Sequence, residues 1–186
     1  PIEDGDKVLD ICAAPGGKST QIASRLNNTG ILISNDISTT RARALLKNIE
    51  NSGARNVIIT NETPERLASK LPSYFDKILI DAPCSGEGMF RLSEDAAKSW
   101  DSYGIDHFCN LQSEILKSCT KMLRPGGMIV YSTCTFSPEE NEGMISKFLN
   151  ENKDFDIVAI DHKGGLDKGR PKWCDGPEKL EGAARL

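Results

Sequence analysis

The stretch Asp10-Ile11-Cys12-Ala13-Ala14-Pro15-Gly16-Gly17-Lys18-Ser19 decides the fold of this chain. It follows the short apolar run Val8-Leu9 and precedes a segment whose apolar residues have helical spacing. In α/β proteins, a strand that breaks into a glycine-rich turn and then a helix brings the backbone close to a nucleotide-like ligand. The stretch therefore predicts a ligand-binding turn that joins the first strand of a parallel sheet to a helix.

Strand-like and helix-like segments alternate along the rest of the chain. Strands are predicted at 7–11, 31–36, 56–60, 75–81 and 128–131, and residues 155–160 are a candidate for one more. Helices are predicted at 18–26, from Ser38 or Thr39 to Gly53, at 64–71, and from Ser137-Pro138 onward. A long connection with a short helical piece around Glu94 to Trp100 is expected over 82–106, followed by a long helix that Arg124-Pro125-Gly126-Gly127 stops. This alternation predicts an α/β fold with a doubly wound, mostly parallel sheet and helices on both faces.

The length of 186 residues corresponds to one domain with a buried core. We expect this domain to cover residues 1–160, and we expect residues 161–186, where the periodicity is lost, to form a flexible tail or linker. The chain opens on Pro1 and not on Met, so we expect a fragment that lacks flanking segments. No apolar run reaches the ~18 residues of a membrane span, and no secretory leader is visible, which favours a cytoplasmic protein.

Charge and cysteine content narrow the function further. The net charge of −4 argues against a broadly basic nucleic-acid surface. The six cysteines include no Cys-x-x-Cys pair and no zinc-like spacing, so no metal site is expected. Reduced thiols are the default for a core-rich chain of this length. The sequence therefore favours thiol chemistry over disulfides or metal binding.

The first loop has three other interpretations. Gly17-Lys18-Ser19 copies the end of a phosphate-binding loop, but the first glycine of that pattern falls on Cys12. Pro15 also lacks the N–H that a phosphate nest needs. The Gly-x-Gly-x-x-Gly pattern of nicotinamide enzymes is absent. The remaining alternative is a tight turn that only connects strand to helix.

The loops after the predicted strands are expected to converge, because ligands of such sheets bind outside the carboxyl ends of the strands. Asp36 ends the second strand and suits the two ribose hydroxyls of a nucleoside, with a helix-capping aspartate as the alternative. Asp81 ends the fourth strand, and Pro83 stiffens the turn that carries Cys84. Cys84 is either a small buried residue or, as its polar neighbours favour, an exposed thiol. Cys134 follows the fifth strand between two threonines, in surroundings that suit a thiolate.

Other candidates carry weaker signals. Cys109, Cys119 and Cys174 have the surroundings of ordinary packing or tail residues, and His107 and His162 have no carboxylate or cysteine partner in sequence. The aromatic residues of the long connection are suited either to stacking on a base or to anchoring the loop; they are Phe90, Trp100 and Tyr103.

Three motifs together resemble the Sun-family RNA cytosine-carbon-5 methyltransferases, in particular the bacterial F-type ribosomal RNA branch. They are Asp10 to Lys18, Asp81-Ala82-Pro83-Cys84-Ser85-Gly86-Glu87-Gly88, and Tyr131-Ser132-Thr133-Cys134-Thr135-Phe136-Ser137-Pro138-Glu139-Glu140-Asn141-Glu142. The resemblance covers roughly residues 5–150 in order. It implies a Rossmann-like fold that uses S-adenosylmethionine.

The resemblance also implies a role for each site residue. The backbone of Cys12, Ala13, Ala14, Pro15, Gly16, Gly17 and Lys18 would cradle the methionine end of the cofactor. Asp36 would hold the ribose, and Asp81 would face both the cofactor and the target cytosine. Cys134 would be the nucleophile and Cys84 would assist product release. Relatives carry an adenine-side Asp after the third strand, and here Thr63 occupies the closest matching position.

Chemistry alone leaves the choice of nucleophile open, because Pro83-Cys84 also resembles the Pro-Cys nucleophile of DNA cytosine methyltransferases.

The Sun-family resemblance implies methyl transfer to carbon 5 of cytosine in ribosomal RNA through a cysteine adduct at carbon 6, with neither DNA nor a membrane as a partner. Two alternatives are a transfer-RNA enzyme of the same family and a non-catalytic assembly factor that binds ribosomal RNA.

Overall fold

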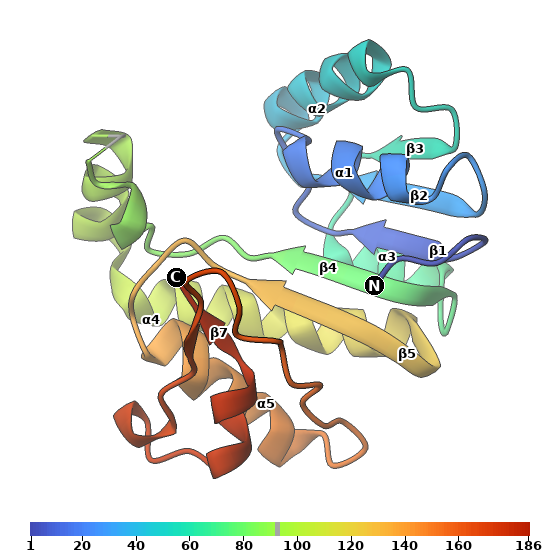
Figure 1. Ribbon diagram of the computed structural model, residues 1–186. Coiled ribbons are helices and arrows are strands. Elements are labelled where there is room, and N and C mark those ends of the chain that lie inside the picture. Colours follow the sequence, from blue (N-terminus) through green and yellow to red (C-terminus); the bar gives the residue numbers. More distant parts are fainter. Residues whose placement is uncertain (92–93) are drawn as a thin grey trace. The chain divides into compact units, whose positions relative to one another are not determined.

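The computed structural model describes residues 1–91 and 94–186, and the side chains of all of these except residues 94–102 (Figure 1). The chain forms two compact units. The first unit comprises Pro1–Ala82 and Glu114–Ser132, and the second comprises Pro83–Ser113 and Thr133–Leu186. These two units do not coincide with the limits expected from the sequence, 1–160 and 161–186. The expected domain limits stay a prediction.

The first unit is built on a parallel sheet of five strands in the order β3-β2-β1-β4-β5. The strands are β1 (Lys7–Asp10), β2 (Ile31–Asn35), β3 (Val57–Thr60), β4 (Phe75–Asp81) and β5 (Leu123–Ser132). The chain runs outward from β1 to β3 and then returns to the other side of β1 with β4. The carboxyl ends of β1 and β4 therefore form the topological switch point, where sheets of this kind bind ligands.

Helices cover both faces of this sheet. The helices of the first unit are α1 (Gly17–Arg25), α2 (Thr39–Ser52), α3 (Pro64–Lys70) and the end of α4 (Glu94–Met122). Ala23 and Leu26 pack on Val8 and Leu32, which have a relative exposure of 1% or less. Figure 1 shows α1 in front of the sheet and α3 behind it. The predicted doubly wound α/β class is confirmed.

The starts and ends of these helices follow local rules. Ser38 is the N-cap of α2 and its side chain accepts the N–H of Arg41. Gly53 ends α2 with a φ of 71°, which glycine adopts without steric cost. Thr63 is the N-cap of α3, and Pro64 occupies the first helical position. The predicted boundaries of α2 and α3 are confirmed.

The segment after β4 agrees with its prediction in outline. The expected long connection over 82–106 contains the short 3-10 helix η1 (Glu87–Met89), and the helical piece expected around Glu94 to Trp100 forms the first part of α4. Gly104 interrupts α4 with a φ of 69°, so α4 consists of two helices that join at this residue. The expected end of the helix just before Arg124-Pro125-Gly126-Gly127 is confirmed, because α4 ends at Met122, but β5 begins at Leu123, five residues before the predicted strand at 128–131. The stretch 124–127 is an irregularity within β5, where the register to β4 shifts between Phe75 and Lys77.

The candidate strand at 155–160 is wrong. Residues 157–160 are all apolar, but the segment forms no strand, and the Ile160 N–H donates to the Gly182 oxygen at 2.8 Å. Phe155 instead packs edge-on against Phe148 of α5 (Met144–Glu151), at 5.1 Å between ring centroids. A strand requires a continuous ladder of backbone bonds, which an apolar run alone does not supply.

Residues 161–186 form short elements where a flexible tail or linker was expected. These are β6 (Asp167–Lys168), η3 (Pro171–Trp173), η4 (Glu178–Gly182) and β7 (Ala184–Arg185), with β6 and β7 antiparallel. Leu180 is fully buried, and Arg185 forms an ion pair with the buried Glu142. Burial alone would raise the pKa of Glu142, but hydrogen bonds from Arg185 and the Arg170 N–H lower it. Elements this short show no helical or strand period, so the sequence pattern could not reveal them.

Candidate functional site

The predicted loop after β1 lines a cavity of about 360 Å³ in the first unit. Asp10 and Asp81, at the carboxyl ends of β1 and β4, border it, and Gln21 of α1 contributes one side. The remaining lining residues are Cys12, Ala13, Ala14, Pro15, Gly17 and Lys18. The cavity thus lies at the switch point of the sheet and brings together six of the seven loop residues predicted to bind the cofactor.

The geometry of this loop follows from its residues. The Ala13 N–H donates to the Asn35 oxygen at 2.8 Å, which ties the loop to the end of β2. Gly16, the seventh predicted residue, adopts a φ of 114° as the N-cap of α1 and does not line the cavity. A β-carbon there would lie 3.0 Å from Leu45 and would strain the backbone. Glycine therefore lets α1 start directly beside the cavity, with its first N–H groups lacking intrahelical partners.

Two carboxylates and one ammonium set the charge of the cavity. Asp10 is fully buried and accepts the Ser19 hydroxyl at 2.6 Å, while its Oδ1 is buried and has no partner among the described residues. Lys18 pairs with Asp81 at 2.7 Å, and both side chains are at least 39% exposed. A half-exposed ion pair is weak, so a zwitterion can separate it. The cavity therefore offers acceptors for an ammonium and a donor for a carboxylate, as the methionine end of S-adenosylmethionine requires.

We expect the affinity for S-adenosylmethionine to rise as the pH rises through about 6. Burial, as the largest cause, raises the pKa of Asp10 to about 6, so below this pH the unliganded protein holds a proton there. A cation in the cavity favours the carboxylate, and binding below this pH must therefore expel the proton. Titration calorimetry on both sides of the midpoint measures the effect.

Ser19→Ala provides the matched variant for this prediction. The Ser19 hydroxyl bond lowers the pKa of Asp10 against the effect of burial. Its removal should move the midpoint of the affinity profile to higher pH. A flat profile in both proteins would exclude Asp10 from cofactor binding.

Asp36 and Thr63 do not line this cavity. The Asp36 side chain is only 2% exposed; its Oδ1 accepts the Ser38 N–H at 2.9 Å, and Arg41 lies 3.4 Å from Oδ2. Arg41 also donates to the Ala14 oxygen at 2.7 Å. The Thr63 hydroxyl accepts the Arg66 N–H at 3.3 Å as a helix cap. In this structure both predicted cofactor residues therefore have local structural partners.

Sequence reasoning did not assign Asp10, Gln21 or Arg41 to the site. Asp10 belongs to the quoted motif, and its position as a carboxylate at the end of a buried strand could have indicated a site residue. Gln21 lies four residues after Gly17, hence on the same face of α1. Nothing in the sequence indicates that Arg41 bridges Asp36 and Ala14, because that contact depends on how α2 packs.

The second unit brings Cys84 and Cys134 together across 50 residues of sequence. Their sulfur atoms are 3.2 Å apart, a hydrogen-bond contact and well beyond the ~2.05 Å of a disulfide. The Cys134 N–H also points at the Cys84 sulfur, at 3.3 Å. Cys134 is exposed and Cys84 is half-buried. The two cysteines singled out from the sequence thus form one thiol pair.

The contact between the two sulfur atoms changes the pKa of the Cys84 thiol. The hydrogen bond to Cys134, and after it burial, raises the pKa of the Cys84 thiol. Cys84 therefore stays protonated near neutral pH, and either sulfur can donate in the contact between the two. A thiol that donates to a neighbouring sulfur stabilises negative charge on that sulfur.

The turn after Cys84 is attached to the loop of Cys134. The Gly88 N–H donates to the Cys134 oxygen at 3.0 Å, and a β-carbon on Gly88 would lie 2.7 Å from that oxygen. Glu87 accepts the Phe136 N–H at 3.2 Å. Only glycine permits this close approach, which explains the residue type after Glu87 in the motif.

The other sulfur and imidazole groups have structural surroundings. Burial raises the pKa of Cys12 to about 12 and that of Cys109 to about 11, so neither is a thiolate near neutral pH. Cys119 is fully buried. His107 stacks on Tyr103 at 4.9 Å, and His162 contacts the Ala183 oxygen at 2.8 Å.

The aromatic candidates remain open as stacking residues. Phe90 is 40% exposed and Tyr103 is 60% exposed, while the Trp100 side chain lies outside the described part.

Within the described residues no group of three or more His, Cys, Asp or Glu side chains is arranged to hold a metal ion. No described helix is long and apolar enough to cross a membrane.

Comparison with protein families and curated proteins identifies the relatives of the chain. The family described as 16S rRNA methyltransferase RsmB/F matches residues 1–172. Over 140 residues the chain is 45% identical to ribosomal RNA small subunit methyltransferase F of Vibrio campbellii, covering 75% of this chain and 29% of that protein. Over 167 residues it is 44% identical to the Aeromonas salmonicida protein of the same name, covering 90% and 35%. The chain thus spans about a third of the length of these relatives.

Solved structures agree with this assignment. A methyltransferase homolog protein from Pyrococcus horikoshii superposes with a TM-score of 0.78 at 34% identity, covering 100% of this chain and 57% of that one. NSun6 from Pyrococcus horikoshii with SFG superposes with a TM-score of 0.71 at 32% identity, covering 92% and 45%. The predicted cofactor, S-adenosylmethionine, and the predicted Sun-family resemblance are both confirmed. The chain therefore belongs to the RsmB/F family of 16S rRNA methyltransferases.

Proposed function

We propose that the protein transfers a methyl group from S-adenosylmethionine to carbon 5 of a cytosine in ribosomal RNA, through a covalent bond between Cys134 and carbon 6. The observation that carries this proposal is the thiol pair, in which two cysteines 50 residues apart lie 3.2 Å from each other. Methyl transfer to an oxygen or a nitrogen does not require a cysteine nucleophile, whereas activation of a pyrimidine carbon does.

Carbon 5 of cytosine is a poor nucleophile until a thiolate adds to the ring. Bonding of the Cys134 sulfur to carbon 6 moves the C5–C6 π electrons, so carbon 5 becomes the nucleophilic end of an enamine. S-adenosylmethionine supplies the methyl group as an electrophile on its sulfonium. Loss of the carbon 5 proton to water or a carboxylate then returns an electron pair to the ring. The C6–S bond breaks, and its electrons leave on the Cys134 sulfur.

The two cysteines divide this work according to their surroundings. Cys134 is exposed, as attack on a base requires. Cys84 keeps its proton and donates it toward the Cys134 sulfur. This hydrogen bond favours Cys134 as a thiolate, both before attack and when it departs. We assign nucleophilic attack to Cys134 and assistance of product release to Cys84.

Asp81 and the loop from Cys12 to Lys18 act on the cofactor in this proposal. Lys18 and the start of α1 hold the carboxylate of the methionine end, and Asp10 and Asp81 hold its ammonium. Asp81 also accepts the Ser132 hydroxyl at 2.8 Å, which orients it. Asp81 is further proposed to hold the ring nitrogen of the target cytosine, where charge develops during attack. Thr63 stays a predicted adenine-side contact.

Asp36→Ala is expected to weaken S-adenosylmethionine binding by about 1–3 kcal/mol, as the loss of hydrogen bonds to a charged group does. The proposal places the ribose hydroxyls on Asp36, where Arg41 now lies 3.4 Å from the carboxylate. Asp76→Ala is the matched control, because Asp76 is also a shielded carboxylate with an arginine partner but sits at the opposite end of β4 from Asp81. Equal calorimetric affinities for both variants would remove Asp36 from the cofactor site.

Nucleoside analysis tests the function directly. The full-length protein is incubated with S-adenosylmethionine and unmodified 16S ribosomal RNA, and the RNA is digested and analysed by mass spectrometry. We expect 5-methylcytosine. Modification of transfer RNA alone would change the substrate, and a methyl group at another atom would overturn the mechanism. Cofactor binding with no methylation of either RNA would favour the non-catalytic assembly factor.

A further inference from the structure

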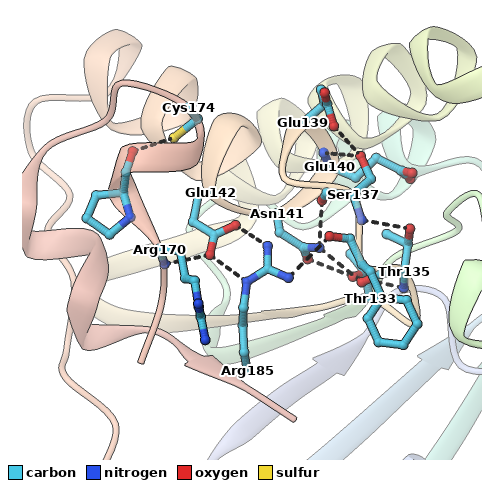
Figure 2. A network of polar contacts seen from close by, with 12 residues as sticks. Thr133, Thr135, Ser137, Glu139, Glu140, Asn141, Glu142, Arg170, Cys174 and Arg185 are labelled. Atoms are coloured by element: carbon cyan, nitrogen blue, oxygen red, sulfur yellow. Dashed lines mark hydrogen bonds and ion pairs between the residues drawn. The ribbon is translucent and has the colours of Figure 1, made fainter. Parts of the chain in front are cut away.

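The π-helical turn η2 (Glu139–Gly143) directs three successive side chains to three different segments of the second unit. Glu140 binds the turn that carries Cys84, Asn141 binds the loop that carries Cys134, and Glu142 binds Arg170 and Arg185. Figure 2 shows Asn141 directed toward the threonine-rich loop and Glu142 toward the arginines. Single π-helical turns are often found at functional sites.

Asn141 holds both neighbours of Cys134. Its Oδ1 accepts the Thr133 hydroxyl at 2.7 Å, and its Nδ2 donates to the Thr135 oxygen at 3.1 Å and the Ser137 oxygen at 2.8 Å. The amide therefore uses both of its donors and one acceptor within a single loop (Figure 2). The backbone on either side of Cys134 has little freedom left.

Glu140 holds the residue after Cys84 directly and the residue before it through Gln112. It is fully buried and accepts the Ser85 N–H at 3.0 Å. It also accepts Gln112 at 2.7 Å, and Gln112 in turn donates to the Pro83 oxygen at 2.9 Å. Adjacent residues of one turn thus fix the backbone around each of the two thiols.

We propose that Asn141 is a positioning residue that sets the separation of the Cys134 and Cys84 sulfur atoms. Its Cα is ~3.8 Å from that of Glu140, so the loops of both thiols are located against the same short piece of backbone. This inference rests on the proposed function, in which Cys134 attacks the base and Cys84 assists its release. Asn141 touches neither substrate nor cofactor in this role and acts through Thr133 and Thr135.

Asn141→Ala in the full-length protein tests the proposal. We expect kcat for RNA methylation to fall by about 10- to 100-fold, because small displacements of a reacting group are costly. The KM for RNA and the affinity for S-adenosylmethionine should stay within about twofold of wild type, since ground-state binding is untouched. Asn152→Ala is the matched control, because Asn152 also donates to a backbone oxygen, that of Phe148 at 2.8 Å, at the far end of α5. It should leave kcat unchanged.

A chemical readout separates this inference from the proposed function. Oxidised glutathione reacts with one thiol of the pair to give a mixed disulfide and one glutathione, and the second thiol then displaces the other glutathione to form the Cys84–Cys134 bond. Mass spectrometry follows the second step, which depends on the separation of the two sulfur atoms. We expect Asn141→Ala to slow this step and Asn152→Ala to leave it at the wild-type rate.

The outcomes are distinct. If wild type forms the disulfide faster than Asn141→Ala but methylates no RNA, the proposed function fails and the positioning role stands. If wild type methylates RNA and Asn141→Ala matches it in both kcat and oxidation rate, the positioning role is overturned. Should Asn141→Ala not fold, Thr133→Val removes the hydroxyl that reaches Asn141 while keeping side-chain shape. A wild-type kcat and oxidation rate in that variant would also overturn the inference.

Discussion

Replacing Cys134 with alanine is expected to abolish RNA methylation by the full-length protein, with kcat lowered by at least about 10³-fold. The sulfur of Cys134 forms the bond to carbon 6 in the proposed reaction, and alanine offers no nucleophile in its place. Cys84 cannot take over readily, because burial still raises the pKa of its thiol after the Cys134 sulfur is removed. Steady-state methylation of unmodified 16S ribosomal RNA measures the loss.

Cofactor binding should survive this change, because the cavity residues all belong to the first unit, whereas Cys134 belongs to the second. Calorimetry with S-adenosylmethionine should therefore give the wild-type affinity. Cys174→Ala is the matched control, since Cys174 is a partly buried thiol of the same unit that contacts the Pro171 oxygen. Full turnover by Cys134→Ala would transfer the nucleophilic role to Cys84.

Replacing Cys84 with alanine is expected to trap the protein on its RNA as a covalent adduct. In the proposed reaction the Cys84 thiol, whose sulfur lies 3.2 Å from that of Cys134, donates to the thiolate that must leave carbon 6. A hydrogen bond to a charged group contributes about 1.5–3 kcal/mol, so its loss should slow release by about 10- to 100-fold. The adduct then accumulates and appears on a denaturing gel as a band of protein joined to RNA.

The double variant with Cys84→Ala and Cys134→Ala identifies the sulfur that forms the bond. The band should disappear in this variant and persist in a Cys84→Ala protein that also carries Cys174→Ala. A band with transfer RNA in place of ribosomal RNA would correct the substrate and keep the mechanism. If neither RNA gives a band although the cofactor binds, the assignment of the release role to Cys84 is wrong.

Local sequence rules predicted those parts of the fold that depend on neighbouring residues. Phe75–Asp81 forms β4 with the predicted limits. Ser38 and Gly53 cap α2 because an N-cap hydroxyl and a left-handed glycine act within one turn of the helix. The same rules failed at 155–160, where a mostly apolar segment forms no strand.

The candidate site was predictable to a similar degree. The loop from Cys12 to Lys18 was assigned from its glycines and its place after a strand, and the cavity lies there. The position of Asp36 was also expected, at the end of β2. The contact of Arg41 with its carboxylate was not, because it arises from the packing of α2 and not from spacing.

The sequence by itself determined the doubly wound sheet, the turn that lines the cavity and the choice of the two cysteines, because periodicity, capping and loop chemistry act over a few residues. Only the tertiary structure decided that Cys84 and Cys134 lie 3.2 Å apart, that the pKa of the Cys84 thiol is raised, and that η2 holds the loops of both. These properties depend on contacts between segments about 50 residues apart in the chain. Such contacts are fixed by packing, and no local pattern in the sequence encodes their distances.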